Sequence, residues 1–132
     1  MSEADELKQY WKKPGNDIVA VRLDLDTDGF SYRKWGGTQH CKAGDWIVLN
    51  RSDTYTVDAE SFAKTYKKTG PGTFLKVTPV WAVKAKDNGS IWTKEGSSRY
   101  AKGNYIVYND ADRRDGYVVS ARLFEDMYEL VK

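Results

Sequence analysis

The chain has 132 residues, of which 40% are hydrophobic and 30% charged, an ordinary composition for a soluble globular protein. Its 21 basic and 19 acidic residues give a net charge of +2, which is too balanced for the concentrated basic footprint that binding to phosphate backbones needs. The sequence shows no apolar run of the ~18 residues that a membrane span needs and no apolar signal region. A single cysteine, Cys41, excludes an internal disulfide. We therefore expect a cytoplasmic protein without membrane contact.

The N-terminal residues 1–13 are mostly polar and predict an arm or a short helix, which the following Pro-Gly pair would end. Residues 18–25 start apolar and become alternating, a pattern that predicts a strand. Asp28 and Gly29 follow, and an Asx-Gly pair between apolar stretches is the strongest local signal for a hairpin. The returning strand is expected at residues 30–35.

The most regular stretch covers residues 43–66. A turn at Gly44 leads into an apolar strand, residues 46–50, with bulky side chains at odd and even positions. Such a strand is expected in the middle of a sheet, covered on both faces. A second strand at residues 55–57 and a short helix follow. Asp58 is suited to cap that helix, because its carboxylate can accept hydrogen bonds from the free amides of the first turn.

This stretch recurs at residues 102–128, with a longer turn between its two strands. In the second half, a matching strand at 80–85, an Asn88-Gly89 pair and a returning strand at 91–94 precede it. The same order of elements twice indicates a tandem duplication. The residues of the first copy that recur are Gly44, Ile47, Val48, Asn50, Tyr55, Val57, Ala59, Phe62 and Tyr66. Their counterparts are Gly103, Ile106, Val107, Asn109, Tyr117, Val119, Ala121, Phe124 and Tyr128.

We predict an α+β fold of two tandem repeats, residues 14–69 and 74–132, with a linker at 70–73 and the arm at 1–13. Each repeat would form an antiparallel β-meander and one short helix. One repeat of roughly 55 to 60 residues would bury only about 60% of its surface if it folded alone. We therefore expect the repeats to share a core in one compact unit with pseudo-twofold symmetry. A groove between the copies is then the expected ligand site.

The first copy also carries three recognisable motifs: Lys-Lys-Pro at residues 12–14, Gly-Asp-Trp-Ile-Val at 44–48, and Phe62 three residues before Thr-Tyr at 65–66. With these motifs the sequence resembles a family of small proteins common in phages and prophages, whose ordinary members have one copy. The second copy departs from the family pattern, with Asn104 in place of the aspartate. The resemblance implies a phage-like intracellular context, the host cytoplasm if the protein is phage-encoded. It implies no activity.

Aromatic residues make up 14% of the chain, with 5 Trp and 9 Tyr. They either fill a small core or line a groove for a planar ligand, base or partner. Basic side chains are interleaved with aromatic ones near the loops of the first copy; they are Lys12, Lys13, Arg33, Lys34 and Lys42, with Trp11, Tyr32 and Trp35. This arrangement suits a solvated face or a site for a phosphate-bearing ligand. We take Arg33, Lys34 and Trp35 from this group, together with Trp46, as candidate ligand-binding residues.

Asp45 and Asn104 complete the candidate set. Each follows a glycine at the entrance of a strand, where its side chain either accepts backbone hydrogen bonds in the turn or forms half of a repeated ligand site. Asn50 and Asn109, at the exits of the same strands, leave the same two interpretations open.

Catalytic and metal-binding patterns fit the sequence less well. His40 and Cys41 are a base and a thiol adjacent in sequence, but neighbouring strand residues point to opposite faces. Residues 24–29 resemble the start of a calcium loop, yet Trp35 stands where the closing glutamate is needed. A hairpin explains this stretch better. We predict no enzymatic activity, no cofactor and no metal site.

The predicted function is that of a non-enzymatic, phage-accessory-like binding protein that acts on a host protein or on a small anionic, nucleotide-like ligand. One alternative is a nucleic-acid-binding module that uses the basic and aromatic face. Another is a structural or assembly protein, for which a defined oligomer is expected.

Overall fold

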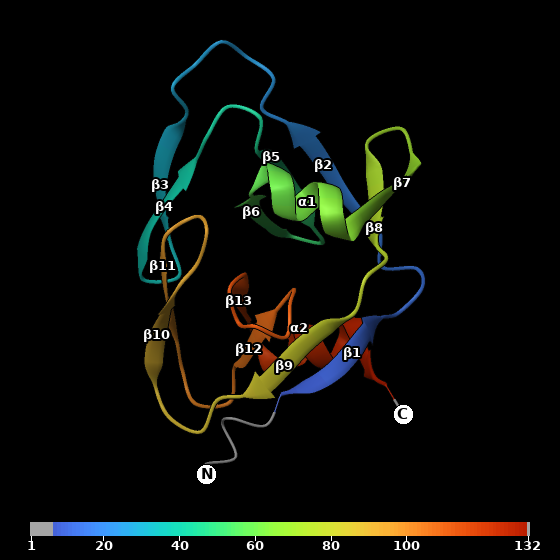
Figure 1. Ribbon diagram of the computed structural model, residues 1–132, viewed down its shortest axis with the longest axis vertical. Coiled ribbons are helices and arrows are strands. Elements are labelled where there is room, and N and C mark those ends of the chain that lie inside the picture. Colours follow the sequence, from blue (N-terminus) through green and yellow to red (C-terminus); the bar gives the residue numbers. More distant parts are fainter. Residues whose placement is uncertain (1–6, 132) are drawn as a thin grey trace.

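The computed structural model describes residues 7–131, which form two five-stranded antiparallel sheets, two separate hairpins and two short helices (Figure 1). The predicted α+β class is therefore confirmed. Neither helix in this part of the chain has the length and apolar character needed to cross a membrane.

The first sheet contains most of the strands from the N-terminal half. Its members are β2 (Ile18–Arg22), β5 (Trp46–Asn50), β6 (Asp53–Val57), β7 (Tyr66–Gly70) and β8 (Thr73–Lys76), in the order β6-β5-β2-β8-β7. The helix α1 (Ala59–Thr65) connects β6 to β7. The strand at residues 46–50 thus forms as predicted, between two neighbours. The expected covering of both its faces is wrong, because Val48 is fully buried on one face whereas Leu49 is 44% exposed on the other.

The second sheet contains the strands of the C-terminal half and the first strand of the chain. Its members are β1 (Lys8–Lys12), β9 (Val80–Lys84), β12 (Tyr105–Tyr108), β13 (Gly116–Val119) and β14 (Tyr128–Leu130), in the order β13-β12-β9-β1-β14. The helix α2 (Ala121–Met127) connects β13 to β14.

Residues 8–12 form a strand, not the short helix that was one of our two expectations. Their side chains alternate between two faces of the sheet, and Tyr10 packs edge-on against Phe124 at 4.8 Å between ring centroids. On the other face, Trp11 is 43% exposed. This burial and the hydrogen bonds to β9 and β14 favour the extended conformation, which local sequence preference does not reveal.

Strands β1 and β8 each lie in the sheet of the opposite half of the chain. β1 comes just before β2 but pairs with β9 and β14. β8 comes just before β9 but pairs with β2 and β7. The predicted linker at 70–73 is accordingly the tight turn between β7 and β8, in which Gly72 has a φ of 71°.

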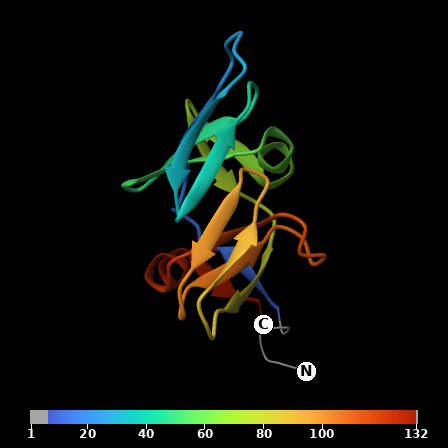
Figure 2. The same cartoon turned by 90° about the vertical axis from the view of Figure 1, so that its left-hand side faces the viewer.

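The two hairpins project from the sheets and meet at one side of the molecule (Figure 2). They consist of β3 (Phe30–Lys34) with β4 (Gly37–Cys41), and of β10 (Gly89–Trp92) with β11 (Ser97–Tyr100). The predicted hairpin turn at Asp28-Gly29 is wrong, because β3 pairs with β4 and not with β2. Gly29 instead approaches the backbone of Cys41 so closely that a Cβ atom would overlap its carbonyl group.

Buried apolar side chains form two clusters, one on each sheet, and not the single shared core that we expected. In the first cluster, Phe62 stacks on Trp46 at 4.1 Å. In the second, Phe124 stacks on Tyr105 at 4.2 Å and on Tyr128 at 4.7 Å. Each short helix thus packs its phenylalanine on its own sheet. The space between the sheets is lined by polar, aromatic and aliphatic side chains together.

Candidate functional site

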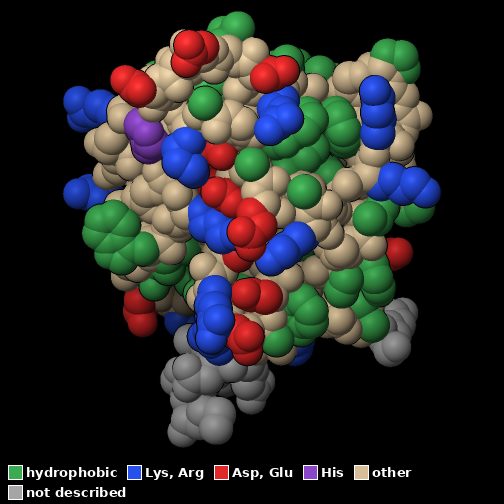
Figure 3. Space-filling model, turned by 45° about the horizontal axis from the view of Figure 1, so that its top comes forward, with side chains coloured by type: hydrophobic (Ala, Val, Ile, Leu, Met, Phe, Trp, Pro, Cys, Tyr) green, Lys and Arg blue, Asp and Glu red, His purple; other side chains and the backbone are tan. Residues whose placement is uncertain are grey.

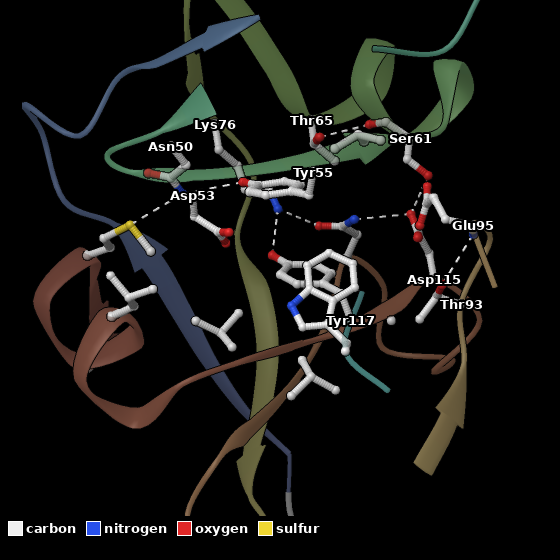
Figure 4. Close-up of a pocket in the computed structure, with 18 of the residues that line it drawn as sticks. Asn50, Asp53, Tyr55, Ser61, Thr65, Lys76, Thr93, Glu95, Asp115 and Tyr117 are labelled. Atoms are coloured by element: carbon white, nitrogen blue, oxygen red, sulfur yellow. Dashed lines mark hydrogen bonds between the residues drawn. The ribbon is translucent and has the colours of Figure 1, made fainter. Parts of the chain in front are cut away.

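A cavity of about 340 Å³ lies between the two sheets (Figure 4). The first sheet lines it with residues of β5, β6, β7 and β8, and the second sheet with residues of β1, β13 and β14. Both helices and the ends of both hairpins complete the lining. The volume falls in the range of about 300–1,000 Å³ that is usual for small-molecule sites.

Lys76 enters this cavity from the end of β8. It is 5% exposed, and its Nζ donates hydrogen bonds to Asn109 Oδ1 and to Tyr117 Oη, both at 2.8 Å. Burial and, to a smaller extent, the charge of Lys12 lower the pKa of Lys76 to about 7, although Asp115 opposes both effects. At neutral pH this amine is therefore close to its titration midpoint.

Lys12 enters from the end of β1, where it lies opposite Tyr128 in the register with β14. It is 8% exposed, and its Nζ lies 5.7 Å from the centroid of the Tyr66 ring. Within residues 7–131, this ammonium has neither a hydrogen-bond partner nor an ion-pair partner. Burial lowers the pKa of Lys12 to about 8, against the opposing influence of Asp17.

Four tyrosines surround the two lysines. Tyr55 and Tyr66 come from the first sheet, and Tyr117 and Tyr128 come from the second. Burial raises the pKa of all four hydroxyls, that of Tyr128 to about 12. The hydroxyls therefore stay protonated at neutral pH, and the cavity presents neutral donors and aromatic rings beside its two amines.

The opposite end of the cavity is acidic (Figure 4). Asp115 Oδ2 accepts hydrogen bonds from Ser61 Oγ at 2.6 Å and from Asn109 Nδ2 at 3.1 Å. Glu95 Oε2 accepts one from the backbone amide of Asp58 at 2.7 Å. Burial, and to a smaller extent the charges of Asp115 and Asp58, raise the pKa of Glu95 to about 7. This carboxyl group therefore also titrates near neutrality.

Contacts between the hairpins hold Trp35 and Glu95 at the cavity. The amide of Arg99 donates to the carbonyl of Trp35, and the amide of His40 donates to the carbonyl of Glu95, both at 2.7 Å. Such close approach requires Gly96, because a Cβ atom there would overlap the carbonyl group of Thr38. The Trp35 ring then lies 6.1 Å from the ring of Tyr55.

The structure places some of the predicted ligand-binding residues at the cavity. Trp35 and Asn104 line it. Lys34 lies just outside, where its Nζ forms an ion pair with Asp53 at 2.7 Å. Arg33 is exposed on β3 and does not contribute to the lining.

Trp46 and Asp45 have other roles. Trp46 packs in the cluster of the first sheet, against Phe62. Asp45 is 1% exposed and accepts hydrogen bonds from the amides of Lys42 at 2.9 Å and Ala59 at 3.0 Å. In the same way, Asn104 Oδ1 accepts from the amide of Ala101 at 2.7 Å. The turn interpretation therefore describes the contacts that both Asx side chains make.

Residues that the sequence analysis did not select form most of the site. The omitted group is Lys12, Tyr55, Tyr66, Lys76, Glu95, Tyr117 and Tyr128. One signal was available in the sequence: several residues that recur in both halves are polar or aromatic and are not needed for a turn. Asn50, Tyr55 and Tyr66 belong to this group, and they and their counterparts line the cavity. Lys12 belonged to the basic and aromatic group near the loops of the first copy, although it was not among the candidates chosen from that group, and Lys76 gave no signal.

His40 and Cys41 point to opposite sides of β4, as expected. Cys41 is fully buried, whereas His40 is exposed and its Nδ1 lies 3.0 Å from Ser31 Oγ. Among residues 7–131, no group of three or more histidine, cysteine and acidic side chains could hold a metal ion.

Replacing Glu95 with glutamine tests the environment of the acidic end. The pKa of Glu95 rises from 4.5 to about 7 on folding. Between these pH values the folded state therefore holds a proton that the unfolded state has lost, and the contribution of Glu95 to stability falls as pH rises. We expect the wild-type protein to lose about 1–2 kcal/mol of unfolding free energy between about pH 5 and 8 relative to Glu95→Gln. Urea denaturation across this window measures the difference.

The matched control is Glu129→Gln, at an exposed position of β14. It should retain the wild-type pH dependence. An identical pH dependence in Glu95→Gln and the wild type would contradict the buried position of this carboxyl group.

Comparisons of the chain with family models, with curated proteins and with solved structures found no match.

Proposed function

We propose that this protein is a non-enzymatic binding protein for a small anionic ligand, which it holds in the cavity between the two sheets. The observation that carries the proposal is Lys12, a residue that is 8% exposed, lines the cavity and has no hydrogen-bond or ion-pair partner for its ammonium group within residues 7–131. Burying a charge without a partner is costly, and an anion in the cavity would offset that cost.

The aromatic lining supports a ligand with a planar part. Trp35 and the four tyrosines supply ring faces on which a base or another flat group could stack. Lys12 and Lys76 supply the positive charge for its anionic group. A nucleotide combines these two chemical features, so a nucleotide-like anion is the class that we favour.

We further propose that the halves of the chain are duplicated copies related by a pseudo-twofold axis near the cavity. The corresponding registers support this: Lys76 lies opposite Tyr66 in the first sheet, and Lys12 lies opposite Tyr128 in the second. The exchange of β1 and β8 between the sheets then delivers one lysine from each copy to the cavity.

Two other functions receive less support. On the face shown in Figure 3, acidic and basic side chains are intermixed, which does not favour a long nucleic acid strand. An enclosed site lined from both sheets favours a small ligand over a surface of a host protein. The phage-like context that the family resemblance implies is compatible with a small-ligand binder.

Calorimetric titration with acetate, benzoate, succinate, AMP and neutral adenosine tests the proposal. We expect the wild-type protein to bind at least one of the anions, and Lys12→Met to weaken this binding about tenfold or more, because a hydrogen bond to a charged group contributes about 1.5–3 kcal/mol. Lys8→Met, the same substitution at an exposed position of β1, is the matched control and should bind like the wild type. The proposal fails if no anion binds or if both variants bind equally well.

A further inference from the structure

The two cavity lysines face the same aromatic ring. Nζ of Lys12 lies 5.7 Å from the centroid of Tyr66, and Nζ of Lys76 lies 5.5 Å from it. Phe62 covers one face of this ring, with a centroid distance of 4.6 Å and an interplanar angle of 14°. Both ammonium groups therefore lie within about 6 Å of one ring, close enough for the charge of Lys12 to lower the pKa of Lys76.

In the described part of the chain, residues 7–131, neither ammonium has a carboxylate partner. Both hydrogen bonds of Lys76 go to neutral groups, on Asn109 and Tyr117. Asp115 influences Lys76 only from a distance, and its Oδ2 already accepts hydrogen bonds from Ser61 and Asn109. Around Lys12, the charged groups that act on it are Asp17, which favours its charged form, and Arg51, which opposes it. Two buried amines thus line one cavity, and among residues 7–131 no carboxylate forms an ion pair with either of them.

A singly charged ligand would compensate only one of these charges. A compact group with two negative charges would compensate both from one position, and the neutral tyrosine hydroxyls and Asn50 could donate to its remaining oxygens. Lysine is an effective phosphate binder as a point charge, because its three donors rotate to suit the anion.

We propose that the ligand carries a phosphate monoester dianion, bound between Lys12 and Lys76. This inference rests on the proposed function and narrows it to one headgroup. The pKa of Lys76, about 7, adds a consequence. At about pH 8 this amine is mostly unprotonated in the free protein, and a neighbouring dianion favours its charged form. Binding is therefore accompanied by proton uptake from the solvent, mostly onto Nζ of Lys76 and in smaller part onto Lys12, whose pKa is about 8.

The test compares AMP with its 5′-phosphate methyl ester, which keeps the base and the sugar but has one charge fewer. Titrations at about pH 8, where a phosphate monoester is a dianion, are run in two buffers of different ionisation enthalpy. We expect the wild-type protein to bind AMP at least about tenfold more tightly than the ester and to take up close to one proton. Lys76→Met should lose both the preference and most of the proton uptake.

Lys68→Met, at an exposed position of the neighbouring β7, is the control and should retain both. If the wild-type protein binds AMP and its ester with equal affinity, and Lys12→Met binds neither, the proposal of a phosphate dianion is overturned. The proposed function, binding of a small anion, then still stands. The dianion is likewise overturned if benzoate or succinate binds and AMP does not. If none of the anions binds, both proposals fail.

Discussion

Replacing Phe124 with alanine should lower the free energy of unfolding by about 3–5 kcal/mol, the usual cost of removing a large buried aromatic side chain. Phe124 is 1% exposed, and its ring contacts those of Tyr10, Tyr105 and Tyr128 at centroid distances of 4.2 to 4.8 Å. These three tyrosines belong to β1, β12 and β14. The substitution therefore removes one contact point shared by three strands that are far apart in the sequence.

Urea denaturation followed by tryptophan fluorescence measures this loss. Phe30→Ala is the matched control, since it makes the same change at a position of β3 that is 42% exposed. It should cost less than about 1 kcal/mol. A similar loss in both variants would show that Phe124 does not hold the second sheet together in the way the contacts indicate.

Replacing Lys76 with methionine should change the pH dependence of stability. The pKa of Lys76 falls from 10.5 to about 7 on folding, so between these values the unfolded state holds a proton that the folded state lacks. The contribution of Lys76 to the unfolding free energy consequently rises with pH across this window, by up to about 1.4 kcal/mol per pH unit. From about pH 7.5 to 9.5, the variant should gain about 2 kcal/mol less than the wild type.

The upper limit of this experiment is set by the tyrosines. Burial raises the pKa of Tyr55, Tyr66, Tyr117 and Tyr128, so above about pH 10 the folded state keeps protons that the unfolded state loses, and stability falls again. Lys68→Met is again the control and should follow the wild type across the whole window. An unchanged slope in Lys76→Met would mean that its amine is solvated in the folded protein.

The local elements were largely predictable from the sequence. The strand at residues 46–50 forms because a run of aromatic and branched apolar side chains favours the extended conformation. The caps were also predictable from residue type: Asp58 accepts from the amides of Glu60 and Ser61, and Ser120 accepts from that of Leu123. In each case the interaction lies within a few residues along the chain.

Pairing between distant strands was not predictable in this way. β1 and β2 are neighbours in the chain but belong to different sheets, and the same is true of β8 and β9. A hairpin was expected at Asp28-Gly29, yet β3 pairs with β4. The Asx-Gly signal describes a backbone preference at one point, whereas strand pairing depends on which side chains the resulting sheet can bury.

The candidate site shows the same division. Trp35 and Asn104 were selected from the sequence and do line the cavity, but Lys12 and Lys76 were not selected. Lysine is normally an exposed residue, and nothing in the surrounding residues indicates that these two are buried. Their burial follows from the exchange of β1 and β8, which carries both side chains into the space between the sheets.

The sequence by itself therefore determined the local conformation: the apolar runs that form strands, the capped helices and the recurrence of the same pattern in both halves. Only the tertiary structure decided which strands share a sheet, that the apolar side chains form two clusters, and that two lysines meet at one tyrosine ring. The physical reason is that hydrophobic periodicity and capping act over a few residues, whereas the pKa of a lysine and its counter-charge depend on groups brought together from the whole chain.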